Sequence, residues 1–228
     1  MRLTEKMNEM KKAELVFIPS PEMGHLVSSV ELAKLLIERE EQLSITVLIM
    51  KPPFDTNIIN YRNSLSASLS SRIRFLELIK EEPSSQLTFS HSFLFQFIDS
   101  HKSCVKEVLA EISNSVSSDL SGIVIDMFCT SFIDVANEFG VPCYIFYTSG
   151  AAMLGLVFHL QSLRDDLKQD LRRYENSDVH LAVPTYINPV PAKVLPPGLF
   201  DKEGIGDIIL NQVRRFKETK GIIVNTFL

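Results

Sequence analysis

Short apolar runs rich in Val, Ile and Phe alternate along the chain with segments whose apolar residues recur at helical spacing. The apolar runs predict strands at residues 13–18, 44–50, 72–78, 122–125, 143–146 and 221–225. The helical spacing predicts helices at residues 26–38, 92–112, 131–139, from about 149, and 204–220. Gly140, followed closely by Pro142, is typical of a helix that ends just before it.

This alternation predicts a mostly parallel sheet with helices on both faces. With right-handed crossovers, such a sheet forms a doubly wound, Rossmann-like α/β domain. The segment 183–198 holds five of the eleven prolines and predicts an irregular loop. Residues 1–12 are polar and predict a flexible tail before a domain at 13–228. No cap follows the last predicted strand, so we expect a fragment or the first half of a two-domain protein.

Composition narrows the classes of function. The net charge is −5 and the cations are not clustered, which argues against nucleic-acid binding. Three cysteines without a CxxC pair favour reduced thiols and a reducing compartment. We find neither a signal-peptide pattern nor an apolar segment of membrane-spanning length. We therefore expect a cytoplasmic protein that does not insert into membranes.

Polar residues that follow strand ends are the candidates for chemistry, because ligands of open α/β sheets bind beyond the carboxyl ends of the strands. Gly24 and His25 follow the first strand at the start of a helix, whose dipole favours the neutral imidazole that a general base needs. Asp126 ends the fourth strand, which we expect beside the first, so its carboxylate could orient His25. On spacing alone, a surface histidine and a helix-capping aspartate remain open alternatives.

The sequence lacks the motifs of several other classes of enzyme. The chain has no GxGxxG or GxxxxGK[ST] loop for nucleotides and no GxSxG elbow for hydrolysis. His101 and Cys104 share a predicted helix face, but two ligands do not make a zinc site, and we expect no metal. Thr148 follows the fifth strand, where it could bind an anion or merely cap the next helix.

Several of these segments, taken in order, resemble the family 1 UDP-glycosyltransferases of plants. The similar segments are residues 13–26, 123–129, 147–151, 189–197 and 221–227. That family has the GT-B fold of two facing Rossmann-like domains, and the resemblance covers the N-terminal, acceptor-binding domain. The family's donor-binding signature contains Trp and lies in the C-terminal domain. Because this chain has no Trp, we expect the donor-binding domain to be absent and the chain alone to be inactive.

The resemblance implies inverting, metal-independent transfer of a hexose, expected to be glucose, to a hydroxyl of a small lipophilic metabolite. A UDP-sugar would be the co-substrate, with no further cofactor. The resemblance implies that His25 and Asp126 are catalytic. It also implies that Gly24 and Thr148 bind the donor and that Met23 and Phe128 bind the acceptor.

Alternatives from other classes remain open. A truncated paralogue could be a non-catalytic module that still binds lipophilic molecules. A nucleotide-dependent oxidoreductase would need the missing GxGxxG loop. A flavodoxin-like signalling domain would want acidic residues after the first strand, where the chain has one Glu and a His.

Overall fold

A six-stranded sheet forms the centre of the molecule. The computed structural model describes residues 12–52, 61, 70–79, 91–200 and 204–226. The strands are β1 (Lys12–Ile18), β2 (Leu43–Met50), β3 (Ile73–Leu78), β4 (Ser118–Asp126), β5 (Cys143–Tyr147) and β8 (Gly221–Val224). All pair in parallel, in the order β3-β2-β1-β4-β5-β8. This is the doubly wound order, so the predicted fold class is confirmed, and the order reverses between β1 and β4, where such sheets bind ligands.

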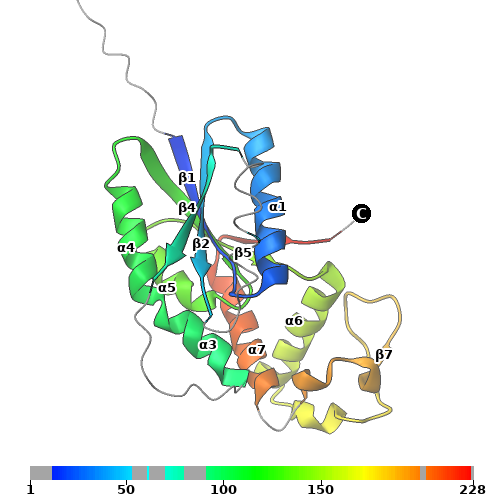
Figure 1. The fold of residues 1–228 in the computed structure, drawn as a ribbon. Coiled ribbons are helices and arrows are strands. Elements are labelled where there is room, and N and C mark those ends of the chain that lie inside the picture. Colours follow the sequence, from blue (N-terminus) through cyan, green and yellow to red (C-terminus); the bar gives the residue numbers. More distant parts are fainter. Residues whose placement is uncertain (1–11, 53–60, 62–69, 80–90, 201–203, 227–228) are drawn as a thin grey trace, which may run out of the picture.

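Helices cover both faces of the sheet. They are α1 (Met23–Arg39), α3 (His91–Ser100), α4 (Lys102–Ser113), α5 (Ile133–Glu138), α6 (Ala151–Asp165) and α7 (Ile205–Arg215). Figure 1 shows α1 on one side of the sheet and α4 on the other. Alternate residues of each strand face opposite sides: Phe17 belongs to the core under α1, whereas Val16 and Ile18 belong to the core under α4. Two apolar cores therefore hold the sheet in place.

The predicted helix at 92–112 is in fact two helices, α3 and α4, and His101 separates them. The backbone N–H of His101 donates to the carbonyl of Ile98 at 3.0 Å, one residue short of the α-helical partner. The carbonyl of Phe97, which that N–H would reach in a continuous helix, accepts from His101 Nδ1 at 2.8 Å instead. The imidazole has thus replaced one backbone hydrogen bond, an exchange that apolar spacing does not reveal.

One helix ends where its sequence predicts, whereas another begins earlier than predicted. Gly140 has φ +65° and ends α5, and the N–H of Val141 donates to the carbonyl of Ala136 at 3.1 Å, as predicted for a glycine stop. In contrast, α1 begins at Met23, three residues before the predicted start, with Glu22 as its extended N-cap residue. Glutamate is not a favoured cap, so the sequence offered no start signal there.

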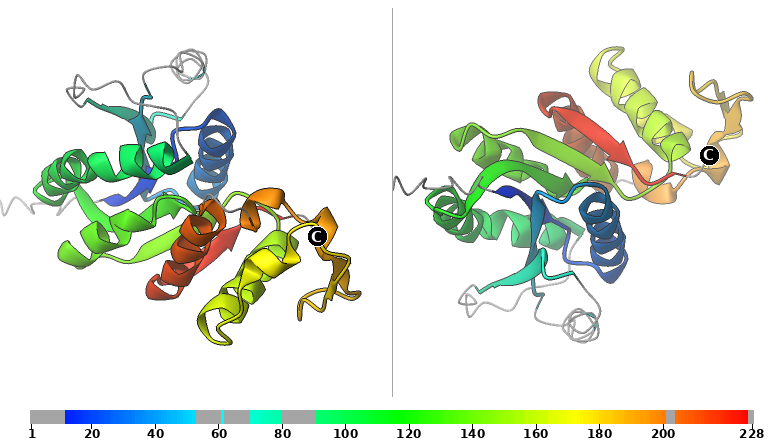
Figure 2. Two further views of the ribbon diagram at one scale, coloured as in Figure 1. Left: turned by 90° about the horizontal axis from the view of Figure 1, so that it is seen from below. Right: turned by 90° about the horizontal axis from the view of Figure 1, so that it is seen from above.

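The segment after α6 is irregular, as its prolines predict. It contains short 3₁₀ turns and two antiparallel two-residue strands, β6 (His180–Leu181) and β7 (Val190–Pro191). Both views of Figure 2 show α6 and this segment beyond β8, at one end of the molecule. The loop approaches α7 so closely that a Cβ atom at Gly206 would collide with the carbonyl group of Leu199.

A buried carboxylate lies in the first half of β1, away from the carboxyl ends of the strands. Glu14 accepts hydrogen bonds from the hydroxyls of Ser44 and Thr46 on β2. An Arg74 nitrogen on β3 lies 3.5 Å from the Glu14 carboxylate. The side chains pair across three neighbouring strands, which satisfies a charge that is only 4% exposed.

None of the helices within the described residues combines the length and apolar character that crossing a bilayer requires.

Candidate active site

Three polar side chains meet at the carboxyl ends of neighbouring strands. His25 lies in the first turn of α1, directly after β1, and Asp126 is the last residue of β4. Thr148 follows β5. Because β4 pairs with both β1 and β5, these three strand ends lie side by side. The sheet therefore brings together residues that are far apart in the sequence.

The imidazole of His25 is hydrogen-bonded to the Asp126 carboxylate. The distance from His25 Nδ1 to Asp126 Oδ2 is 2.6 Å, and the Asp126 side chain is fully buried. The other carboxylate oxygen accepts from the backbone N–H of Phe128 at 3.0 Å. Thr148 Oγ1 lies 3.0 Å from the same Nδ1 atom. The predicted proximity of His25 and Asp126 is confirmed, and the fixed carboxylate favours a proton on Nδ1, which leaves Nε2 as the basic atom.

Glu22 lies on the other side of the imidazole, a contact that the sequence analysis missed. Its Oε2 atom is 3.4 Å from His25 Nε2. The Glu22 side chain is half exposed, whereas His25 is largely covered. The spacing of three residues at a helix start could have suggested this pair, had the start of α1 been known.

Burial and charge act in opposite directions on His25. Desolvation by burial lowers the pKa of His25, but the Asp126 hydrogen bond, the Asp126 charge and the Glu22 charge outweigh it and raise the pKa above 6.5. The helix dipole was expected to favour the neutral ring, but the neighbouring carboxylates favour the charged one. A helix end contributes about half a charge, spread over several amides, whereas the carboxylate is a full charge in direct contact.

Aromatic rings lie beside the histidine. The ring centroid of Phe128, which follows β4, is 5.4 Å from that of His25. Phe95 of α3 meets Phe128 edge-on at 5.9 Å. Phe128 was predicted near this site, and Phe95 was not, because nothing in the sequence tells which residues of α3 approach the crevice.

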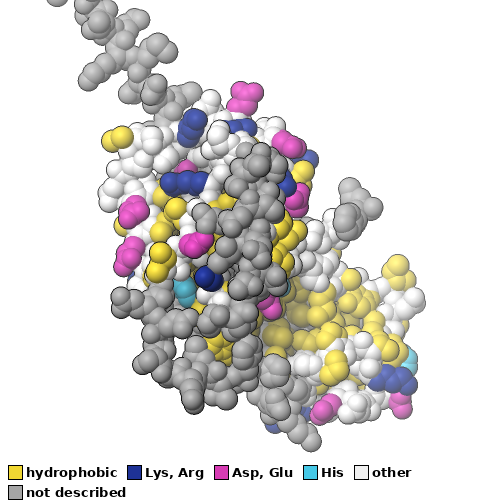
Figure 3. Space-filling view, viewed as in Figure 1, with side chains coloured by type: hydrophobic (Ala, Val, Ile, Leu, Met, Phe, Trp, Pro, Cys, Tyr) yellow, Lys and Arg dark blue, Asp and Glu magenta, His cyan; other side chains and the backbone are white. Residues whose placement is uncertain are grey.

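An apolar cavity of about 180 Å³ adjoins Phe128. Its walls come from the segment after β4, the start of the loop after β5, α6, the loop before α7, and α7. The lining residues are Met127, Phe128, Tyr147, Ser149, Met153, Val157, Pro196, Gly198, Leu199, Ile209, Gln212, Val213 and Phe216. The helix α6, the proline-rich loop and α7 thus all contribute to this wall. Figure 3 shows hydrophobic side chains gathered on the surface over the α6 region.

The remaining predicted residues lie at the start of α1. Gly24 is exposed, and nothing lies within 4 Å of the position that a Cβ atom would occupy. Met23 packs against the core under α1 and is not among the residues that line the cavity. Their roles toward donor and acceptor stay predictions. Among the described residues, no three His, Cys, Asp or Glu side chains are grouped so that they could hold a metal ion.

Comparison with known proteins identifies similar chains of about twice the length. No family model matches. The chain is 52% identical over 227 residues to UDP-glucose flavonoid 3-O-glucosyltransferase 6 of Fragaria ananassa, covering 96% of this chain and 47% of that protein. The chain thus spans about half the length of the curated relatives it matches.

Solved structures of plant glycosyltransferases are also similar to this chain. A UGT transferase from Siraitia grosvenorii in complex with UDP has a TM-score of 0.80 at 40% identity, over 95% of this chain and 45% of that one. Medicago truncatula UGT71G1 complexed with UDP-glucose has a TM-score of 0.79 at 36% identity, over 97% of this chain and 47% of that one. The similarity in fold therefore extends over nearly the whole chain.

Proposed function

Because 95% of this chain is homologous to the N-terminal half of plant UDP-glycosyltransferases, we propose that it is the acceptor-binding half of a UDP-sugar-dependent hexosyltransferase. The enzyme would transfer a hexose, expected to be glucose, to a hydroxyl group of a small lipophilic plant metabolite, with inversion at the anomeric carbon. The name of the Fragaria ananassa relative, a flavonoid 3-O-glucosyltransferase, supports a flavonoid-like phenol as the acceptor.

The observation that carries this proposal is the His25–Asp126 pair beside an apolar cavity. With Nδ1 bonded to Asp126 at 2.6 Å, Nε2 is the atom that can accept a proton. A lipophilic acceptor in the cavity next to Phe128 would present its hydroxyl to Nε2. Small-molecule sites are typically apolar with few polar groups, as here. At about 180 Å³ the cavity would hold one ring system, with the reacting hydroxyl outside it, toward His25.

The proposed step is a single displacement. The acceptor O–H proton moves to His25 Nε2 while the oxygen attacks the anomeric carbon from the face opposite UDP. The bond from that carbon to the diphosphate oxygen breaks, and its electron pair leaves with UDP. Asp126 acts through His25: it fixes the ring and stabilises the imidazolium that forms. One displacement inverts the configuration of the anomeric carbon.

We propose donor-binding roles for two residues from their positions beside His25. The Thr148 hydroxyl, 3.0 Å from His25 Nδ1, would contact the transferred sugar. The amide of Gly24 belongs to the first turn of α1, where backbone N–H groups can approach a diphosphate. We propose no metal ion and no further cofactor. The main donor contacts would come from a C-terminal half, so the chain alone should transfer sugar poorly.

We further propose a cytoplasmic location. All three cysteines, which lie within the described residues, are free thiols, as is usual in a reducing compartment.

The test is a transfer assay with UDP-glucose and a flavonol. Residues 1–228 would be fused to the C-terminal half of the strawberry relative, with the unfused chain as a second arm. We expect the fusion to transfer glucose and His25→Ala to lose about 10²–10⁴-fold of the rate. Lys106→Ala removes a charge from a surface ion pair with Glu138 on α5 and should keep the rate. An active fusion that His25→Ala leaves unchanged would refute the proposed role of His25.

A further inference from the structure

One side-chain amide lies in the wall of the apolar cavity. Among the thirteen lining residues, only Gln212 carries an amide, and the other α7 residues that line the cavity, Ile209 and Val213, are apolar, as is Phe216 just after α7. Tyr147 and Ser149 contribute hydroxyl groups to the same wall. A few polar groups in a mostly apolar wall are the usual source of orientation and selectivity in a small-molecule site. Nothing in the sequence analysis pointed to Gln212.

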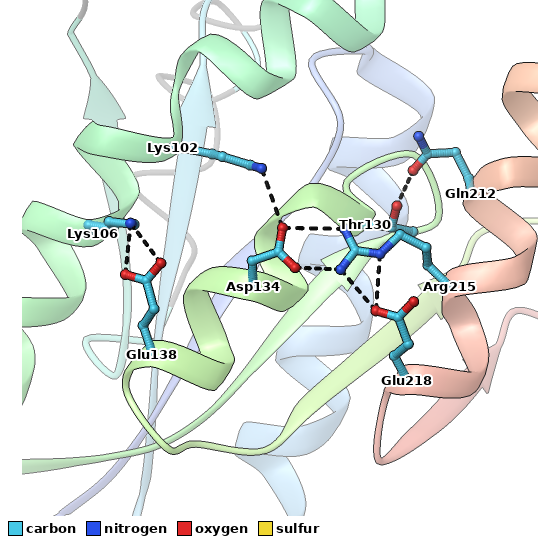
Figure 4. Close-up of polar contacts among 8 residues, drawn as sticks. All are labelled: Lys102, Lys106, Thr130, Asp134, Glu138, Gln212, Arg215 and Glu218. Atoms are coloured by element: carbon cyan, nitrogen blue, oxygen red, sulfur yellow. Dashed lines mark hydrogen bonds and ion pairs between the residues drawn. The ribbon is translucent and has the colours of Figure 1, made fainter.

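Thr130 fixes the orientation of the Gln212 amide. Thr130 lies just after Asp126, in a 3₁₀ turn, and is only 1% exposed. Its hydroxyl donates a hydrogen bond to Gln212 Oε1. Because the oxygen is engaged by Thr130, the amide nitrogen points away from it, as Figure 4 shows. Within the part of the chain that the structure describes, no side chain or carbonyl accepts from the two N–H groups of Gln212, so they remain able to donate to a ligand.

Ion pairs hold the helix that carries Gln212. At its C-terminal end, Arg215 lies 2.5 Å from Asp134 of α5 and 2.9 Å from Glu218 (Figure 4). Near its start, Arg164 of α6 donates to the carbonyl of Asp207 at 3.0 Å. Each exposed pair contributes little energy alone, but together they fix α7 against two neighbouring helices. The amide is therefore presented from a positioned element.

The ring of Phe128 connects the histidine to the cavity whose wall contains Gln212. Phe128 contacts His25 by its ring and also lines the cavity, so it lies between the two. The inference rests on the proposed function, in which the acceptor hydroxyl lies at His25. Such an acceptor would extend along Phe128 and place its far end near α7. An N–H donor covered by a ligand without an acceptor atom loses its water and gains no partner.

We propose that Gln212 is a specificity-determining residue that donates a hydrogen bond to an oxygen of the acceptor molecule. It selects phenols that carry a carbonyl or similar oxygen remote from the reacting hydroxyl, that is, aryl ketones and related oxygenated aromatics. Purely hydrocarbon phenols of the same size bind the cavity less tightly.

The test is calorimetric binding of two matched phenols to the 228-residue chain. The probes are para-hydroxybenzophenone and para-benzylphenol, which differ by a carbonyl in place of a methylene group. We expect the ketone to bind the wild-type chain about three- to ten-fold more tightly, the effect of one neutral hydrogen bond. Gln212→Leu should reduce that ratio to about one. Thr130→Val should reduce it partly, and Thr130→Ser should restore it.

The ratio of affinities, compared between proteins, cancels the different acidity of the two phenols. Asn211→Leu is the matched control, because it removes an exposed amide from the same helix, bonded to Arg164, and should keep the wild-type ratio. Melting curves confirm that each variant is folded. A ratio that persists in Gln212→Leu, or that is one in the wild type, overturns this inference alone. If neither phenol binds the wild-type chain, the proposed acceptor site fails as well.

Discussion

His25 Nδ1 lies 2.6 Å from Asp126 Oδ2, although 101 positions separate the two residues along the chain. The pair forms because β1 and β4 are neighbours in the sheet and both residues follow the carboxyl ends of these strands. It leaves Nε2 on the side of Glu22. The first three predictions below depend on this geometry.

In the fused enzyme, the rate lost through His25→Ala should depend on the acidity of the acceptor. An aliphatic alcohol needs the base fully, so the loss should approach the upper part of ~10²–10⁴-fold. An acidic phenol arrives nearly deprotonated and should lose much less. The measurement is the ratio of wild-type to variant kcat/KM over acceptors of graded pKa. A flat ratio would mean that His25 does not act as the base.

Replacing Asp126 should cost less than replacing His25. Asp126→Ala removes the group that orients the imidazole but leaves the base, so we expect a loss about ten- to a hundred-fold smaller than that of His25→Ala. The double variant should resemble His25→Ala, because Asp126 acts only through the histidine. Rates of the four proteins form the cycle. Losses that simply multiply would show that the two residues act independently.

The rate should rise with pH through the pKa of His25, since only the neutral imidazole accepts a proton. Burial lowers that pKa, but Asp126 and Glu22 together raise it above 6.5. The midpoint of the acid limb of kcat/KM should therefore lie above 6.5. Asp126→Asn should move it to lower pH, and Glu22→Gln should move it the same way by less. A midpoint unaffected by Asp126→Asn would contradict the assignment.

Gly206→Ala should disturb the cavity, although Gly206 itself does not line it. Its new methyl group would collide with the backbone carbonyl of Leu199, so the loop that lines the cavity must shift. We expect a loss of about 1–3 kcal/mol in the free energy of unfolding and weaker binding of phenols. Gly221→Ala is the control, because its methyl group would meet only Tyr144 at the ordinary distance of 3.7 Å. Denaturant unfolding and calorimetry measure both effects, and equal behaviour of the two variants would refute the prediction.

Glu14→Ala should reduce stability without changing the site. It would remove the carboxylate that accepts from the hydroxyls of Ser44 and Thr46, and would leave Ser44 only the distant Ala13 carbonyl at 3.4 Å. We expect about 1–3 kcal/mol less free energy of unfolding. The affinity for phenols should stay unchanged in the folded protein, because Glu14 lies in the first half of β1, away from the strand ends. A large loss of affinity in a folded variant would contradict this separation.

The sequence by itself determined the six strands of the main sheet, although β4 begins four residues earlier than predicted, as well as the fold class and the central pair of the candidate site. Buried parallel strands are continuous apolar runs, so β2 and β5 were predicted within about one residue. The first and fourth strands are neighbours in the usual strand order of a doubly wound sheet, which is why Asp126 could be expected beside His25. The helix stop at Gly140 was predictable because it depends on one residue's own backbone freedom.

Only the tertiary structure decided what surrounds that pair. The break at His101 and the start of α1 at Met23 depend on a side chain that competes with the backbone and on an unfavoured cap. The contact of Glu22 with Nε2 and the place of Gln212 in the cavity depend on how α1 and α7 pack against the sheet and its loops. Periodicity shows which face of a helix is buried, but not which distant element that face meets. The His25–Asp126 pair could therefore be predicted from the sequence, whereas the side chains around it could not.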